Sequence, residues 1–293
     1  MSIKIYTDAS SNLFKDILDE KKVEVTVLPM LVEIGDLHYL CYSDDIDVKK
    51  FSTTFYQMMK DGQKPKTSLP NPGLFEEKME EEIKNGNKVL YISIAGGISG
   101  TYQTCHMVAD QLNEKYKGDY IHVINSKTAG LGEGRIVLYA YEEAKKEEDF
   151  DILTKKVEDY VGRVRSEFVV DSLNYLMQTG RVSAFKAKMV SLLSIKPLLY
   201  GSDEGKIEVT SLAHGKLKAI KKLAGQVVEH ISDKTSKVYI SHCNAMDDAL
   251  RLKDLLHEEG IDNIEIYFYD FVTGAHVGPG TVAVFYEGEN RKI

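Results

Sequence analysis

The stretch KVLYISIAGGISGTYQTCHMVADQLNEKYKGDYIHVINS (residues 88–126) contains a strand pattern, a glycine turn, a helix pattern and a second strand pattern. Apolar and β-branched residues over 88–94 and again over 120–126 predict two short β-strands. Between them, apolar residues recur at the spacing of one helix face: Cys105, Val108, Ala109 and Leu112. Strand–helix–strand repetition requires crossover connections, so the stretch predicts an α/β fold built on a mainly parallel sheet.

Glycines and small hydroxyl residues occupy the turn between the first of these strands and the helix. Gly96 and Gly97 follow the strand, and Ser99 lies just before the helix begins. A strand end, a glycine turn and a helix N-terminus together present unpaired backbone N–H groups, which favours an anion site. The chain contains neither G-x-G-x-x-G nor G-x-x-x-x-G-K-[ST], so the two main nucleotide-binding motifs are missing. An ordinary structural turn explains Gly96 and Gly97 equally well.

Strand patterns on both sides of this stretch extend the α/β prediction to two domains. A charged helical tract over 141–161 separates an earlier set of strand patterns from a later one. We therefore expect an N-terminal α/β domain over 1–160, with a mainly parallel sheet and flanking helices. A C-terminal α/β domain over 161–293, with a mixed sheet and helices, completes the prediction.

The composition excludes several classes of protein. The 293 residues include 45 acidic and 37 basic side chains, for a net charge of −8, which argues against a nucleic-acid partner. The three cysteines, Cys41, Cys105 and Cys243, are odd in number and lack C-x-x-C spacing, which favours reduced thiols. No leader sequence precedes the first strand, and no apolar run approaches the roughly 18 residues that cross a bilayer. These features predict a soluble, cytoplasmic protein.

Two further segments with turn residues carry small polar residues or histidine. Thr67 and Ser68, in KTSLPNPG (66–73), offer hydroxyls on an extended or turning segment, although an ordinary loop is the better interpretation in isolation. His276 lies among three glycines and a proline in TGAHVGPG (273–280), where the backbone is expected to be tight and irregular. Its imidazole is suited to donate to a carboxylate or phosphate. A buried or surface structural role for His276 is equally compatible with this pattern.

Other charged residues give weaker signals. Arg181 follows the helix-ending Gly180, and arginine suits planar anions, but a surface arginine that caps helix carbonyls would look the same. Asp8 ends the first strand, where open α/β sheets bind ligands, yet it lacks the D-x-D of aspartyl-phosphate enzymes. His242 and Cys243 are adjacent at a strand end and point to opposite sides. Asp44, Asp45 and Asp47 lack a metal-ligand frame, so the sequence predicts neither a catalytic residue nor a metal site.

Together these segments resemble the DegV family, which includes the fatty-acid-binding subunits of bacterial fatty acid kinase. The resemblance runs along the whole chain. It rests on seven short motifs in the family's order: YTDASSNL, KTSLPNPGLFEE, ISIAGGISGTYQT, VINSKTAGLGEG, LNYLMQTGRVSAFKA, SIKPLL and GAHVGPGTVAV.

The resemblance implies a two-domain α/β protein that encloses a long-chain fatty acid such as palmitate. The acyl chain would lie in an apolar tunnel to which the C-terminal domain contributes. The carboxylate would meet the residues that match the family's motifs: Thr67, Ser68, Ser99 and His276. The backbone of Gly96 and Gly97 would approach the same carboxylate. Arg181 matches the arginine of a turn that looks like a contact for the kinase.

This sequence departs from the family pattern around the expected carboxylate. Ala95 and Gly96 stand where many relatives have two serines, and Leu69 stands where a glutamine is common. Ala275 and Val277 replace the threonines that flank the family's histidine. These changes remove polar groups, which leaves open whether the head-group contacts or the preferred lipid differ.

The sequence thus predicts a non-catalytic, fatty-acid-binding protein that presents an acyl carboxylate to a separate kinase for acyl-phosphate formation. No cofactor besides the bound lipid is expected, and a transient membrane contact is compatible with lipid transfer. The alternative is a small-molecule phosphotransferase or hydrolase that uses His276 and Asp8. A regulatory protein with a vestigial pocket is a third possibility. Acyl length, unsaturation, oligomeric state and the identity of the kinase are left open.

Overall fold

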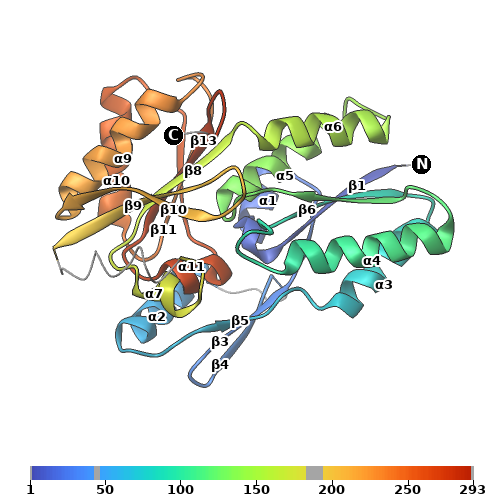
Figure 1. Ribbon diagram of the computed structural model, residues 1–293, viewed down its shortest axis with the longest axis horizontal. Helices are drawn as coiled ribbons and strands as arrows, with labels where there is room; N and C mark the ends of the chain where they lie inside the picture. Colours follow the sequence, from blue (N-terminus) through green and yellow to red (C-terminus); the bar gives the residue numbers. More distant parts are fainter. Residues whose placement is uncertain (1, 43–46, 183–193, 292–293) are drawn as a thin grey trace.

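The computed structural model describes residues 2–42, 47–182 and 194–291 and arranges them around three β-sheets (Figure 1). The first sheet is parallel, with the strand order β2-β1-β6-β7. Its strands are β1 (Ile3–Asp8), β2 (Thr26–Leu28), β6 (Lys88–Ser93) and β7 (Ile121–Asn125). Apolar side chains of α3 (Pro72–Lys84) and α4 (Thr101–Tyr116) cover one face, and α5 (Leu131–Ala144) covers the other. The strand–helix–strand prediction for residues 88–126 is confirmed.

The second sheet is mixed and six-stranded, with the order β10-β9-β8-β13-β11-β12. Its strands are β8 (Val164–Val169), β9 (Ile195–Gly201), β10 (Ile207–His214), β11 (Val238–His242), β12 (Ile264–Phe268) and β13 (Val282–Glu287). The helices α9 (Lys216–His230) and α10 (Met246–Glu258) bury one face with a separate apolar cluster. The prediction of a mixed sheet with helices is therefore confirmed.

A small third sheet was not predicted. It has the order β4-β3-β5 and comprises β3 (Met30–Ile34), β4 (Leu37–Cys41) and β5 (Lys66–Thr67). β2 ends at Leu28, within the run VEVTVLP (23–29), and β3 begins at Met30, directly after this run. Pro29 lacks a backbone N–H and interrupts the ladder, so the chain leaves the first sheet there and enters the third.

The third sheet and two short helices stand at the junction of the two larger sheets. α11 (Phe271–Val277) packs against β3, β5 and α7 (Asn174–Gln178), as Figure 1 shows. The remaining elements are η1 (Ala9–Ser11), α1 (Lys15–Lys21), α2 (Val48–Lys60) and α6 (Phe150–Val161). One apolar cluster runs from Ile92 of the first sheet to Phe168 and Phe285 of the second. A functional site at this junction would therefore receive residues from both halves.

The domain boundary near residue 160 stays a prediction. The motif LNYLMQTGRVSAFKA is described only as far as Val182, and the rest of it lies outside the described residues. Asp44 and Asp45, considered above as metal ligands, also lie outside them. Among the described residues, no helix is both long and apolar enough to cross a membrane.

Candidate functional site

A cavity of about 100 Å³ lies where the carboxyl end of β6 meets β5, α7 and α11. Its polar lining consists of Thr67, Ser68, Ser99, Arg181, Thr273 and His276. Its apolar lining consists of Met30, Leu69, Ile94, Ile98, Leu176, Ile207, Val272 and Val277. Five of the candidate site residues, Thr67, Ser68, Ser99, Arg181 and His276, therefore meet in one cavity, although they come from segments far apart in the chain.

Thr67 and His276 form the central polar pair. Thr67 Oγ1 lies 3.0 Å from His276 Nε2, so β5 and α11 are joined by a side-chain hydrogen bond. Burial, together with the nearby positive charge of Arg181, lowers the pKa of His276 to about 4. The imidazole is therefore neutral at neutral pH. Its Nδ1 is buried and has no hydrogen-bond partner among the described residues.

The backbone around His276 differs from expectation. The glycines and proline of TGAHVGPG suggest an irregular loop, but His276 lies in the last turn of α11. Asp270 caps this helix by accepting a hydrogen bond from Thr273 N at 2.6 Å. Gly278 and Gly280 then take positive φ angles of 83° and 82° and end the helix. The irregular segment thus begins after the histidine, and the imidazole is held on a helix.

The hydroxyls of Ser68 and Ser99, beside this pair, differ in whether they have a proton available for a ligand. Ser99 Oγ lies 2.9 Å from Thr101 Oγ1, and either oxygen can be the donor. Ser68 Oγ instead accepts from Leu31 N at 3.0 Å and donates to Leu69 O at 2.9 Å. A hydroxyl carries only one proton, so Ser68 as placed has none left for a ligand. Ser99 keeps that capacity if Thr101 supplies the proton between them.

The glycines of the β6–α4 turn do not line the cavity. Gly96 N donates to Asn125 Oδ1 at 3.2 Å, so this amide is already paired. Gly97 lies against the β9–β10 turn, where a Cβ on Gly97 would come within 2.6 Å of Gly205 O. The structure therefore gives Gly97 a packing function, since only a glycine allows the two backbones to approach this closely.

Arg181 differs from the surface arginine that the sequence offered as one interpretation. Its side chain is half-buried and lines the cavity. Nε donates to Ile98 O at 3.2 Å, and Nη1 donates to Thr179 O at 2.5 Å. Burial lowers the pKa of Arg181 from its ordinary value, but a guanidinium stays charged at neutral pH. The bond to Ile98 O joins Arg181 to the β6–α4 loop.

The residues that depart from the family pattern lie at different places around the cavity. Leu69 and Val277 line it, so two polar positions of the family pattern are apolar here. Ala95 lines a neighbouring cavity, and Ala275 is buried outside both. The loss of polarity therefore lies along the wall and not at the Thr67–His276 pair.

A second cavity of about 40 Å³ adjoins the first and shares Ile98, Ile207, Thr273 and Val277 with it. Its other apolar lining residues are Ala95, Ala129, Phe168, Tyr269 and Phe285. Sequence reasoning missed Ile207 and the β9–β10 turn beside it. The Gly205 turn is a recognisable hairpin signal, but no local pattern shows that it packs over Gly97.

The structure does not bring Asp8 and His276 together. Asp8 is fully buried, accepts from Ser10 N at 3.0 Å and lies outside the lining of the cavity. Within the described ranges, no group of three or more His, Cys, Asp or Glu residues could hold a metal ion. The site therefore offers hydroxyl, imidazole and guanidinium groups beside apolar side chains, which suits a ligand with one small anionic end and an apolar body.

Fold and cavity together define an α/β protein with two small adjoining cavities, the first of which combines polar side chains with an apolar lining. The chain belongs to the DegV family, because the family model described as "Uncharacterised protein, DegV family" matches residues 2–289. A DegV domain-containing protein of Clostridium perfringens is 32% identical over 290 residues, which cover 98% of each chain.

Two solved structures share the fold along the whole chain. The fatty acid binding DegV family protein SAG1342 from Streptococcus agalactiae is 30% identical, with a TM-score of 0.85 over 99% of this chain and 100% of that one. The Fatty Acid Kinase (Fak) B3 protein of Streptococcus pneumoniae, solved loaded with linoleic acid, has a TM-score of 0.82 and 18% identity. That match covers 99% of this chain and 100% of the other, and at this identity it shows the fold alone.

Proposed function

We propose that this protein binds a long-chain fatty acid, with the carboxylate at the Thr67–His276 end and the acyl chain along the two adjoining cavities. The observation that carries the proposal is the meeting of Thr67, Ser99, Arg181 and His276 in one cavity whose remaining lining is mainly apolar and which adjoins a second cavity. A single carboxylate fits one cation and a few neutral donors, whereas a polyphosphate requires more positive charge. The fatty-acid-binding relative from Streptococcus agalactiae supports the same ligand class.

The binding free energy would come mainly from the acyl chain. Burial of about 14 methylenes at about 0.8 kcal/mol each contributes about 11 kcal/mol before ordering costs. The cavities, about 100 and 40 Å³, are smaller than the roughly 300 Å³ at which ligand pockets usually begin. Lining side chains must therefore move apart to admit the chain, and the bound lipid would fill the space that opens.

A neutral His276 explains how the head group is held. If Nε2 carries the imidazole proton and donates to Thr67 Oγ1, the threonine hydroxyl can donate to a carboxylate oxygen. Arg181, close enough to affect the pKa of His276, supplies the positive charge. We further propose that the protein presents this carboxylate to a separate kinase and that Arg181 takes part in that contact. The Fak B3 name of one structural neighbour supports the kinase link.

Lipid extraction tests the proposal directly. Protein purified under native conditions should carry a fatty acid of about 14 to 18 carbons, because a filled apolar channel stabilises the fold. Native mass spectrometry before and after delipidation, followed by titration with palmitate, measures both the endogenous ligand and its rebinding. Apo protein that takes up no added fatty acid would contradict the proposal. Turnover of phosphorylated small molecules by the isolated chain would favour the enzyme alternative.

The head-group assignment has its own test. Thr67→Val should weaken palmitate binding by about 1–2 kcal/mol, since the variant keeps the shape but removes one donor to a buried carboxylate. Thr67→Ser retains the hydroxyl and is the matched control. Ser99→Ala should have an effect of similar size, and the two losses should not add because both groups meet the same carboxylate. Wild-type affinity in both variants would place the carboxylate elsewhere.

A further inference from the structure

The turn that follows His276 is bonded to its surroundings on both sides. Thr281 Oγ1 donates to Val277 O at 3.0 Å, so the far side of the turn is joined back to the residue next to His276. Gly280 N donates to Cys243 O at 2.8 Å and joins the turn to the end of β11. A displacement of Gly280 would therefore displace the C-terminal end of α11, which carries the imidazole.

A lysine of the second sheet's helix layer bonds this turn. Lys216 is the first residue of α9, and its Nζ donates to Gly280 O. A positive charge is unfavourable at the N-terminus of a helix, because the helix dipole places partial positive charge there. The helix itself thus gives no reason for a lysine at this position, and the bond to the turn does.

Asp171 supplies the opposite charge beside the turn. Its Oδ1 lies 3.0 Å from Lys216 Nζ and 3.2 Å from Lys196 Nζ, and Asp248 Oδ2 lies 4.0 Å from Lys216 Nζ. Burial opposes ionisation of Asp171, but the charges of Lys216 and then Lys196 outweigh it and lower the pKa, so the carboxylate is charged at neutral pH. A Cβ on Gly280 would collide with Asp171 Oδ2, which places the carboxylate directly against the turn.

Asp171 also lies on the short segment between β8 and α7. α7 contributes Leu176 to the lining of the first cavity, and it packs against α11. A Cβ on Gly278 would collide with the ring of Tyr175, so α7 contacts the same turn from its other side. The Lys216–Asp171 pair therefore joins two cavity-lining helices to the second sheet.

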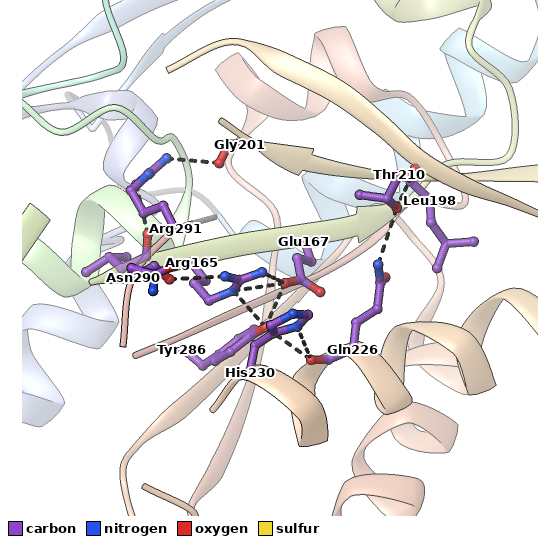
Figure 2. Close-up of polar contacts among 11 residues, drawn as sticks. Arg165, Glu167, Leu198, Gly201, Thr210, Gln226, His230, Tyr286, Asn290 and Arg291 are labelled. Carbon is purple, nitrogen blue, oxygen red and sulfur yellow. Dashed lines mark hydrogen bonds and ion pairs between the residues drawn. The ribbon is translucent and has the colours of Figure 1, made fainter. Parts of the chain in front are cut away.

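α9 gives Lys216 a fixed support. The apolar side chains of α9 are buried against the second sheet. Figure 2 shows Gln226 of α9 directed toward Thr210 of β10, and 3.3 Å separate Nε2 from Oγ1. Tyr286 OH of β13 lies 3.5 Å from Gln226 O. Because the helix is held along its length, its first residue can hold the turn in place.

We propose that Lys216, oriented by Asp171, is a positioning residue for His276. By holding Gly280, it keeps the end of α11 where the imidazole meets Thr67 and the ligand carboxylate. Neither Lys216 nor Asp171 is among the described residues that line the two cavities, so the effect on the ligand passes through His276. The proposal rests on the proposed function, because it takes His276 as part of the head-group site.

Titration of delipidated protein with palmitate tests the positioning role. Lys216→Met keeps the apolar stem but removes the donor and the charge, and it should weaken palmitate binding by about three- to tenfold. Lys216→Arg keeps both the charge and a donor and should recover most of this loss. Lys218→Met removes the same charge from an exposed position of α9 and should bind as wild type does. If Lys216→Met does not fold, Asp171→Asn carries the test and should give a smaller loss.

A second background separates positioning from a general loosening of the fold. His276→Asn removes the group that Lys216 is proposed to position. In that background Lys216→Met should cause no further loss of affinity, because the two residues act through one contact. An equal loss with and without His276 would overturn the proposal.

The imidazole ¹⁵N shifts of His276 give a readout that needs no ligand. The resonances are assigned by their absence in His276→Asn, and they report the tautomer and the hydrogen bond to Thr67. They should change in ligand-free Lys216→Met and stay unchanged in Lys218→Met. Wild-type shifts in a folded Lys216→Met variant would overturn the positioning role.

The outcomes distinguish this inference from the proposed function. If wild type binds no palmitate, the proposed function fails, whereas the imidazole shifts still decide whether Lys216 positions His276. If wild type binds palmitate and a folded Lys216→Met variant binds it equally well, the positioning role alone is wrong.

Discussion

At the scale of single residues, the Thr67–His276 pair depends on which imidazole nitrogen carries the proton. His276 Nδ1 is buried without a partner in the part of the chain that the structure describes, while Nε2 faces Thr67 Oγ1 at 3.0 Å. With the proton on Nε2, the imidazole donates to Thr67 Oγ1. The proton of the threonine hydroxyl is then available for a ligand in the cavity. Since the pKa of His276 is lowered to about 4, this neutral state persists well below neutral pH.

Arg181→Ala separates ligand binding from partner contact. The guanidinium lines the cavity, so its loss should weaken palmitate binding by about 1.5–3 kcal/mol, the range for a hydrogen bond to a charged group. Arg181→Lys keeps the charge but not the planar geometry, and it should recover part of the affinity. Titration with palmitate and acyl-phosphate formation with the cognate kinase are the two measurements. Unchanged affinity with lost phosphorylation would limit Arg181 to the partner surface.

At the scale of elements, the sequence predicted the central unit and missed the parts that complete the site. The pattern of Cys105, Val108 and Leu112 predicted α4 correctly, because an amphipathic helix shows its period locally. β5 has only two residues and pairs with β3 through Val32 and Thr67. So short a strand has no pattern of its own, and its partner across the sheet sets its conformation.

α11 was missed for a different reason. Gly274 lies in the middle of this seven-residue helix, where glycine is unfavourable by about 1 kcal/mol relative to alanine. A Cβ at this position would collide with Tyr56 OH, so tight packing against α2 explains the glycine. Tertiary contact therefore overrides local propensity, and the sequence of α11 reads as a loop. The family motif still singled out His276 as a candidate site residue, because a motif match depends on residue types and not on the local backbone conformation.

The β6–α4 turn supplies a prediction about packing between elements. Gly97→Ala should destabilise the fold by about 1–3 kcal/mol, because the added Cβ would lie 2.6 Å from Gly205 O and backbone atoms cannot move aside cheaply. Gly225 of α9 is the matched control, since a Cβ there meets nothing within 4 Å. Gly225→Ala should be neutral or stabilising by up to about 1 kcal/mol. Urea unfolding of both variants checks the difference, and equal stabilities would remove the close-approach explanation.

At the scale of the whole molecule, two fully buried carboxyls lie behind the site, under the end of β1. Thr7 Oγ1 lies 2.8 Å from Ile92 O and 2.9 Å from Glu133 Oε1. The carbonyl can only accept, so it takes the single threonine proton, and the second contact requires a proton on Glu133. Ser10 Oγ contacts both Glu133 Oε2 and Asp8 Oδ1 and has one proton for the two. The Thr7 contact therefore favours a neutral carboxyl at Glu133, while Asp8 accepts from Ser10 N, Ile94 N and Tyr91 OH.

The electrostatics agree with this proton count. Burial, followed by repulsion from Asp8, raises the pKa of Glu133 well above its ordinary value. Burial also raises the pKa of Asp8, despite its hydrogen bonds from Ser10. Asp270, buried at the start of α11, has its pKa raised to about 8, again mainly by burial. The folded protein thus holds protons that the unfolded chain releases near pH 4.

Glu133→Gln should therefore flatten the dependence of stability on pH. A carboxyl whose pKa is raised on folding contributes its full stability below the unfolded pKa, near 4.5 for Glu133, and loses it as the pH rises through the folded value. Glutamine can donate to Thr7 and accept from Ser10 as the protonated acid does, but it does not ionise. Above the unfolded pKa the free energy of unfolding should fall less steeply with rising pH in the variant, by up to about 1.4 kcal/mol per pH unit. Glu114→Gln, at an exposed position of α4, should keep the wild-type slope. Urea unfolding across this range measures all three proteins, and a Glu133→Gln slope equal to that of wild type would mean that Glu133 is ionised in the folded protein.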